Sequence, residues 1–142
     1  NTLILVNTNT AENNIKVKTT GLVILIGTSP IPNSNVTKYF CDTCVSLKRI
    51  WLIYSIENEN QKATVKYAEI LTKQIKEIYN DKVQFEFIPI KDVGNELAIF
   101  EDLSINVKLE PSEDISLHLN YTGGTKCMSV AAYSFLKEKF AN

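Results

Sequence analysis

Apolar runs of strand length alternate along this chain with segments in which apolar residues recur at helical spacing. The clearest run, residues 22–26, is continuous and rich in branched side chains, as expected for a strand covered on both faces. Further strands are predicted at residues 50–54, 83–90 and 115–119. Strands that alternate with helices are typical of an α/β domain with a mainly parallel central sheet.

Helices are predicted between these strands and after the last one, at residues 36–47, 61–79, 93–103 and 127–139. The second and the last have core-facing stripes, formed by Thr64, Ala68, Leu71, Ile75 and Ile78 and by Met128, Ala131, Ala132 and Phe135. Residues 27–35 are predicted to remain a loop, because Pro30 and Pro32 disfavour an early helix start. Asn33 or Asn35 is the predicted cap.

The first 20 residues carry a weaker pattern. Residues 3–6 and 15–18 resemble two strands around the Asn-rich turn 7–14, but an edge hairpin and an ordered linker have the same signature. We therefore expect an N-terminal strand or hairpin extension at residues 1–20 and a main domain at residues 21–142. Because the chain begins with asparagine, we also expect it to be a piece of a longer protein.

Composition narrows the classes of partner. The 142 residues are 44% hydrophobic and 22% charged, the profile of one globular domain with a real core. The formal net charge of -1 gives no long-range attraction to nucleic acid, so direct binding of long nucleic acid is disfavoured. No apolar run approaches the roughly 20 residues that span a bilayer.

The chain has three cysteines, Cys41, Cys44 and Cys127, and no secretion signal, which favours free thiols and a cytoplasmic location. Cys41 and Cys44 form a C-x-x-C, but no second Cys or His pair completes a zinc site, and His118 stands alone in an apolar strand. We favour packing roles for these residues over redox or metal chemistry, and we expect no bound metal.

The most informative segment is residues 120–126, Asn-Tyr-Thr-Gly-Gly-Thr-Lys, where a predicted strand gives way to a predicted helix. Gly123 and Gly124 let backbone N–H groups face a ligand, and the start of the helix adds its dipole. Thr122 and Thr125 offer hydroxyl groups, and Lys126 offers a positive charge. The segment therefore predicts a phosphate-recognising loop.

Polar loops follow three of the predicted strands, at residues 27–35, 55–61 and 120–126. In an open parallel sheet, ligands bind outside the carboxyl ends of the strands where the strand order reverses. We expect the three loops to converge there, with two helix starts facing one pocket. These loops supply most of the candidate ligand-binding residues: Gly27, Thr28, Ser29, Pro30, Ile31, Asn33, Ser34, Ser55, Asn58, Gln61, Asn120, Thr122, Gly123, Gly124, Thr125, Lys126 and Met128.

Known phosphate and hydrolase motifs do not fit. Only Gly27 follows the first core strand, so the G-x-G-x-x-G of dinucleotide sites is missing. Lys126 has neither a glycine directly before it nor a Ser or Thr after it, so the Walker pattern fails. No G-x-S-x-G elbow occurs, and His118 alone does not indicate a Ser-His-Asp arrangement. We therefore assign no catalytic residues and expect no cofactor.

Two segments resemble a known family, the CRISPR-associated Rossmann fold (CARF) domains that sense cyclic oligoadenylates. Residues 120–128, NYTGGTKCM, are similar to the family's strand-end TGGTK-x-M motif, and residues 22–30, LVILIGTSP, to its first strand and nucleotide loop. The resemblance covers residues 21–140. It implies a Rossmann-like three-layer α/β/α fold and a homodimer whose two cradles form one symmetric pocket. The implied ligand is a ring of 3′-5′ linked adenylates, most often four.

A ring of four adenylates carries about four phosphate charges, so each protomer of such a dimer neutralises only two, without a basic surface. The adenine bases need readers, and by position the candidates are Asn33, Ser34, Asn58, Asn60 and Gln61. The resemblance further implies a sensor in a type III CRISPR antiviral effector. We expect that effector, a nuclease, another enzyme or a membrane segment, upstream of Asn1.

Other functions are also compatible with these residues. The domain could be a metal-independent ring nuclease, in which a ribose 2′-OH attacks the neighbouring phosphate while Lys126 and backbone amides stabilise the charge. It could also be a Rossmann-like domain for a mononucleotide or sugar phosphate. The plainest reading of residues 122–126 is a tight turn with a capped helix. Likewise, Thr28, Ser29 and residues 33–35 could only shape a turn, and residues 57–61 could be a solvated helix start.

Overall fold

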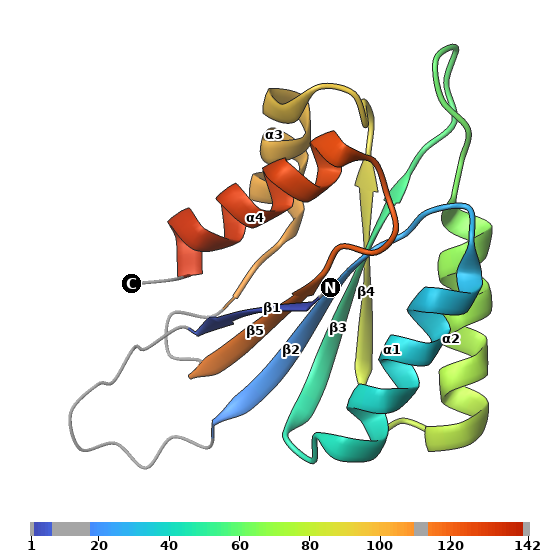
Figure 1. The fold of residues 1–142 in the computed structure, drawn as a ribbon, viewed down its shortest axis with the longest axis vertical. Coiled ribbons are helices and arrows are strands. Elements are labelled where there is room, and N and C mark those ends of the chain that lie inside the picture. The colour runs from blue at the N-terminus through green and yellow to red at the C-terminus, as the bar shows by residue number, and fades with distance from the viewer. Residues whose placement is uncertain (1, 7–17, 110–113, 141–142) are drawn as a thin grey trace.

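A computed structural model describes residues 2–6, 18–109 and 114–140 of the chain. In this part of the chain, one five-stranded sheet in the order β1-β5-β2-β3-β4 carries helices on both faces (Figure 1). The strands are β1 (Thr2–Val6), β2 (Thr19–Leu25), β3 (Leu47–Ser55), β4 (Gln84–Ile90) and β5 (Ile115–Asn120). The helices are α1 (Pro30–Thr43), α2 (Val65–Tyr79), α3 (Glu96–Asn106) and α4 (Lys126–Phe140).

The four strands from β2 to β5 are parallel to one another and alternate with the helices. This confirms the predicted Rossmann-like α/β architecture. The N-terminal strand β1 lies antiparallel along β5, with Thr2 opposite Asn120 and Val6 opposite Ser116. The extension thus contributes a strand to the sheet, whereas residues 15–17, most of the second half of the predicted hairpin, lie outside the described residues.

Successive residues of the central strands face opposite cores, as the period of a strand requires. On one face, Leu22, Ile24 and Leu52 pack with residues of α1 and α2 such as Cys41 and Leu71. The other core, beneath α3 and α4, contains Val23, Leu25, Trp51, Ile99, Phe135 and others. Because both faces of β2 and β3 are covered, their sequences read as continuous apolar runs.

The first helix differs from its prediction. It begins at Pro30 and ends at Thr43, whereas the sequence pattern placed it at residues 36–47. Proline is favoured at the first helical position, because its fixed φ suits the helix and its missing N–H would have no partner there. Ser29, not Asn33 or Asn35, is the N-cap residue, and Leu47 already begins β3.

Smaller differences affect α2 and α3. The helix α2 begins at Val65 rather than residue 61, and Ile78, predicted to face the core, is 53% exposed. The α3 helix runs from Glu96 to Asn106, later than predicted, because the Asn95 side chain caps it by accepting a hydrogen bond from the Ala98 N–H at 3.1 Å. The predicted stripe of α4 is confirmed as buried core, and no helix of the described residues is long and apolar enough to cross a membrane.

Candidate ligand-binding site

The site lies where the strand order reverses. β2 occupies the middle of the sheet, with β3 and β4 on one side of it and β5 on the other. The loop after β2 leads into α1 on one face, and the loop after β5 leads into α4 on the opposite face (Figure 1). The carboxyl ends of β2 and β5 therefore lie side by side beneath two diverging helix starts, which is the usual position of a ligand crevice in open α/β sheets.

A cavity of about 190 Å³ occupies this position. It is lined by residues of two of the predicted loops: Gly27, Thr28, Ser29, Pro32, Thr122, Gly123 and Gly124. All but Pro32 were among the predicted ligand-binding residues, and Pro32 belongs to the predicted loop 27–35 without having been a candidate. The lining contains no carboxylate and no imidazole, so it offers backbone and hydroxyl donors to an anion but no general acid or base.

Glycines allow the two loops to touch backbone to backbone. A Cβ atom on Gly123 would lie 2.4 Å from the Leu25 carbonyl oxygen and 2.9 Å from the Gly27 nitrogen. A Cβ atom on Gly27 would lie 3.0 Å from the Gly124 nitrogen, and Gly124 itself has a φ of 79°, which L side chains rarely adopt. The glycines therefore hold the walls of the cavity together, in addition to leaving room for a ligand.

Thr125 forms the cap of α4. Its Oγ1 accepts a hydrogen bond from the Met128 N–H at 3.1 Å and donates one to the Val93 carbonyl at 2.7 Å. The same residue's carbonyl accepts from the Ser129 N–H. The hydroxyl of Thr125 is thus committed to the helix start and to the loop before α3, so the capping interpretation holds for this residue.

Lys126 occupies the first position of α4, where its side chain is exposed. Among the described residues it has no ion-pair partner. The N–H groups of Lys126 and Cys127 have no acceptor within the helix, because the first residues of any helix lack one. This end of α4 therefore presents an ammonium group and backbone donors two residues after Gly124, an arrangement that favours anions, although Lys126 is not one of the residues that line the cavity.

The start of α1 offers fewer donors. Of its first four residues, Pro30 and Pro32 have no N–H, so only Ile31 and Asn33 carry one. Ser29 caps the helix by position without a side-chain hydrogen bond, which leaves its exposed hydroxyl at the cavity. Of the two predicted helix starts, α4 therefore offers more donors to an anion, and α1 offers mainly its dipole.

Besides Pro30 at its first position, α1 carries three more candidates, and they take different positions. Asn33 is buried, and its Nδ2 donates to the Leu25 carbonyl at 3.4 Å and lies close beneath Gly123. Ile31 is exposed, and the Ser34 hydroxyl donates to Gln74 of α2 at 3.2 Å, away from the cavity. None of the three lines the cavity, and Asn33 supports its floor.

The third predicted loop is not part of this cavity. The Ser55 hydroxyl donates to the Lys62 carbonyl at 2.6 Å, and the Asn58 amide donates to the Lys91 carbonyl at 2.7 Å. Gln61 donates to the Ile56 and Ile90 carbonyls and accepts from the Val93 N–H. The reason is topological, since β3 is separated from β5 by β2. These side chains fasten the β3–α2 loop to the loop after β4.

Asn120 and Met128 support the glycine loop from below. Asn120 is fully buried, and its Oδ1 accepts from the Thr122 N–H at 3.3 Å. The sulfur of Met128, also buried, accepts from the Thr125 N–H at 3.5 Å and lies under Gly124. Both residues belong to the predicted motif and set the shape of the loop.

Comparison with known proteins agrees with this geometry. A protein-family model described as the Card1 CARF domain matches residues 22–142, a range that includes both glycine loops and all four helices. No curated protein gives a significant match to the chain.

Proposed function

The chain belongs to the Card1 CARF domain family, and from this membership we propose that it senses a cyclic oligoadenylate for a type III CRISPR defence system. We assign ligand binding to residues 21–142 and regard residues 1–20 as an extension that adds β1 to the sheet. The ligand proposed is cyclic tetra-adenylate, bound by two copies of the chain.

The observation that carries this proposal is the contact between the two glycine loops at the switch point. Gly27–Ser29 and Thr122–Gly124 enclose a cavity next to the starts of α1 and α4. The groups around this contact are hydrogen-bond donors: the exposed hydroxyls of Thr28, Ser29 and Thr122, the first amides of α4, and Lys126. Donors of this kind suit the phosphates of a nucleotide.

The size of the cavity supports a shared site. Pockets that enclose a whole small-molecule ligand measure about 300–1,000 Å³, and this one measures about 190 Å³. One chain can therefore enclose a phosphate and part of a nucleotide, but not a ring of four. Two cavities facing each other across a two-fold axis would divide the ring and its charge equally.

A shared ring would also explain how the domain signals. The ligand shifts the relative orientation of two protomers only if it binds the active arrangement more tightly than the resting one. We propose that this reorientation controls an effector in the same protein, which could be a nuclease, another enzyme or a membrane segment.

Incubation of the purified chain with cyclic tetra-adenylate, followed by chromatography of the nucleotide, tests the proposal. We expect tight binding and recovery of the intact ring, with linear tetra-adenylate and AMP binding much more weakly. Conversion of the ring to linear products would instead assign a ring nuclease. Equal affinity for AMP and the ring would assign a mononucleotide site.

A further inference from the structure

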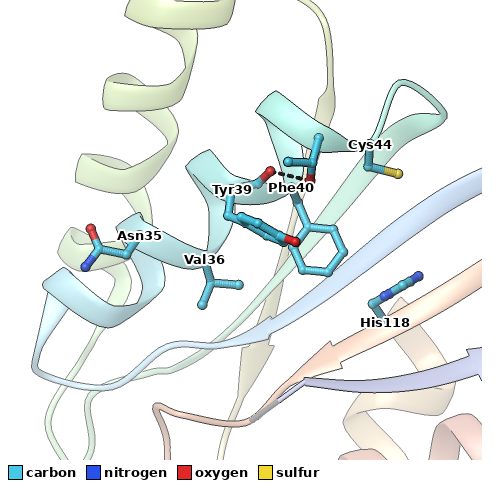
Figure 2. Close-up of a pocket in the computed structure, with 7 residues that line it drawn as sticks. Asn35, Val36, Tyr39, Phe40, Cys44 and His118 are labelled. Carbon is cyan, nitrogen blue, oxygen red and sulfur yellow. Dashed lines mark hydrogen bonds between the residues drawn. The ribbon is translucent and has the colours of Figure 1, made fainter.

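A groove of about 560 Å³ lies away from this site, between α1 and β5. Figure 2 shows the groove, with Val36, Tyr39 and Phe40 on α1, Cys44 at its end and His118 on β5. The Phe40 ring meets the His118 ring edge to face at 5.0 Å between centroids. Cys44 therefore borders an open groove that small molecules can enter.

The Cys44 thiol has hydroxyl partners. Its Sγ lies 3.4 Å from the Ser46 Oγ, and the Ser46 Oγ lies 2.7 Å from the Oγ1 of the buried Thr20. A chain of hydroxyls can donate toward a thiolate and stabilise it. Partial burial acts to raise the pKa of Cys44, but the hydrogen bonds of Ser46 and Thr20 outweigh it and the pKa is lowered.

The second cysteine of the C-x-x-C has the opposite environment. Cys41 lies one turn earlier on α1, is 1% exposed and belongs to the core beneath α1 and α2. Burial raises the pKa of its thiol. An accessible thiol with a stabilised thiolate next to a buried neutral thiol is the division of roles found in redox-active dithiols.

We propose that Cys41 and Cys44 form a redox-active dithiol that is oxidised by a peroxide, with Cys44 as the attacking thiol and Cys41 as the resolving one. The Cys44 sulfur attacks one peroxide oxygen, the O–O bond breaks, and the other oxygen leaves as hydroxide. The resulting sulfenic acid is attacked by the Cys41 sulfur, which releases water and forms the disulfide. The dithiol loses two electrons and two protons, and hydrogen peroxide is reduced to two waters.

The backbone at Cys44 permits this closure. Residues three apart on a helix have Cβ atoms about 5–6 Å apart, and a disulfide needs about 3.5–4.5 Å. Cys44 is the C-cap residue of α1, with extended φ and ψ of -111° and 95°, so it can move without unwinding the helix interior. The hydrogen bond from its N–H to the Phe40 carbonyl is the one that such a movement would strain.

A metal site is the other common role of a C-x-x-C. Among the described residues, no group of three or more His, Cys, Asp or Glu side chains is placed to hold an ion. Zinc needs four ligands in a structural site, and the pair supplies two. Two thiols with different environments and no further ligands nearby in the described part of the chain therefore favour a thiol–disulfide couple.

The test uses a Cys127→Ser variant, which removes the third thiol and leaves the pair intact. The folded variant is treated with equimolar hydrogen peroxide and digested, and the peptides are analysed by mass spectrometry. We expect one Cys41–Cys44 disulfide. Accumulation of sulfinic acid on Cys44 without a disulfide would overturn the proposal. The proposal would also be overturned if peroxide left both thiols of the folded protein unchanged but oxidised them in the protein unfolded by urea.

Two further variants assign the roles. With Cys41→Ser in the same background, a sulfenic acid should persist on Cys44 and be trapped by dimedone. If that variant does not fold, the rate of alkylation by iodoacetamide in the Cys127→Ser protein decides the order. Cys44 should react at least about tenfold faster than Cys41, and Ser46→Ala should slow it. Faster reaction of Cys41 would reverse the assignment and contradict the proposal.

Discussion

The backbone of Gly123 lies against that of Gly27, so closely that a Cβ atom on Gly123 would stand 2.9 Å from the Gly27 nitrogen. This contact joins the loop after β5 to the loop after β2 and forms the wall of the cavity. The TGGTK segment is therefore a structural joint as well as a candidate anion site. The two roles make different predictions.

Replacement of Gly123 by alanine should destabilise the domain. Its Cβ would meet the Leu25 carbonyl oxygen at 2.4 Å, and backbone atoms on both sides leave little room to move. Overpacking of this kind costs about 1–3 kcal/mol of unfolding free energy, measurable by urea denaturation. Gly94→Ala is the matched control, because the nearest atom to its new Cβ is 3.5 Å away. Equal stability of the two variants would show that the loops are not in contact.

Loss of the Thr125 hydroxyl should weaken the start of α4. Thr125→Val keeps the shape of the side chain but removes the acceptor for the Met128 N–H and the donor to the Val93 carbonyl. We expect a loss of about 1–2 kcal/mol in thermal or urea unfolding, and Thr125→Ser should recover most of it. If the valine variant were as stable as the parent, the hydroxyl would not cap the helix and would be available to bind a ligand.

Lys126 should matter for binding and not for stability. Its side chain is exposed, so Lys126→Ala should leave the unfolding free energy nearly unchanged. A ring shared by two chains contacts two copies of Lys126, and each charge-assisted contact to phosphate contributes about 1.5–3 kcal/mol. The variant therefore loses about 3–6 kcal/mol, which predicts roughly a hundredfold to ten-thousandfold weaker affinity for the ring by calorimetry. Lys48→Ala makes the same charge change at the opposite end of the sheet and should bind normally. Equal loss in both variants would point to a general charge effect.

His118 should make the fold sensitive to mild acid. Burial lowers the pKa of His118 from 6.5, so in acid the unfolded chain takes up a proton that the folded chain resists. The stability contributed by the neutral ring is therefore complete above pH 6.5 and falls as the pH drops through that value. His118→Phe keeps an aromatic contact to Phe40 and removes the titration. The free energy of unfolding, measured in urea from pH 7.5 to 5, should fall more steeply for the parent than for the variant. Equal slopes in the two proteins would contradict the assignment.

The sequence alone located the strands and the glycine junction. Residues 22–26 and 50–53 are continuous apolar runs and are buried on both faces of their strands. Residues 115–119 instead alternate, with Ile115, Leu117 and Leu119 buried and Ser116 and His118 half-buried. The change from this alternation to Gly123, Gly124 and a periodic helix marks a strand–helix turn. These features could be predicted because they depend on runs of apolar residues and on glycines, both of which are visible in the sequence.

Other features depend on partners distant in sequence. Gln61 was predicted as a ligand-binding residue, with a solvated helix start as the alternative, but its amide donates to the carbonyls of Ile56 and Ile90, and only the fold reveals that. The pairing of β1 with β5 joins residues more than a hundred positions apart, so no local pattern could indicate it. The start of α1 is different, because proline is favoured at a first helical position and the sequence therefore already contains this signal at Pro30.

The central claim is that one cyclic ligand is divided between two copies of this domain. Native mass spectrometry of the chain with cyclic tetra-adenylate tests it most directly, since it reports the number of chains and of ligands in one complex. The account predicts two chains with a single ring, and loss of that species in Lys126→Ala. A complex of one chain with one ring, or two chains with two, would contradict it.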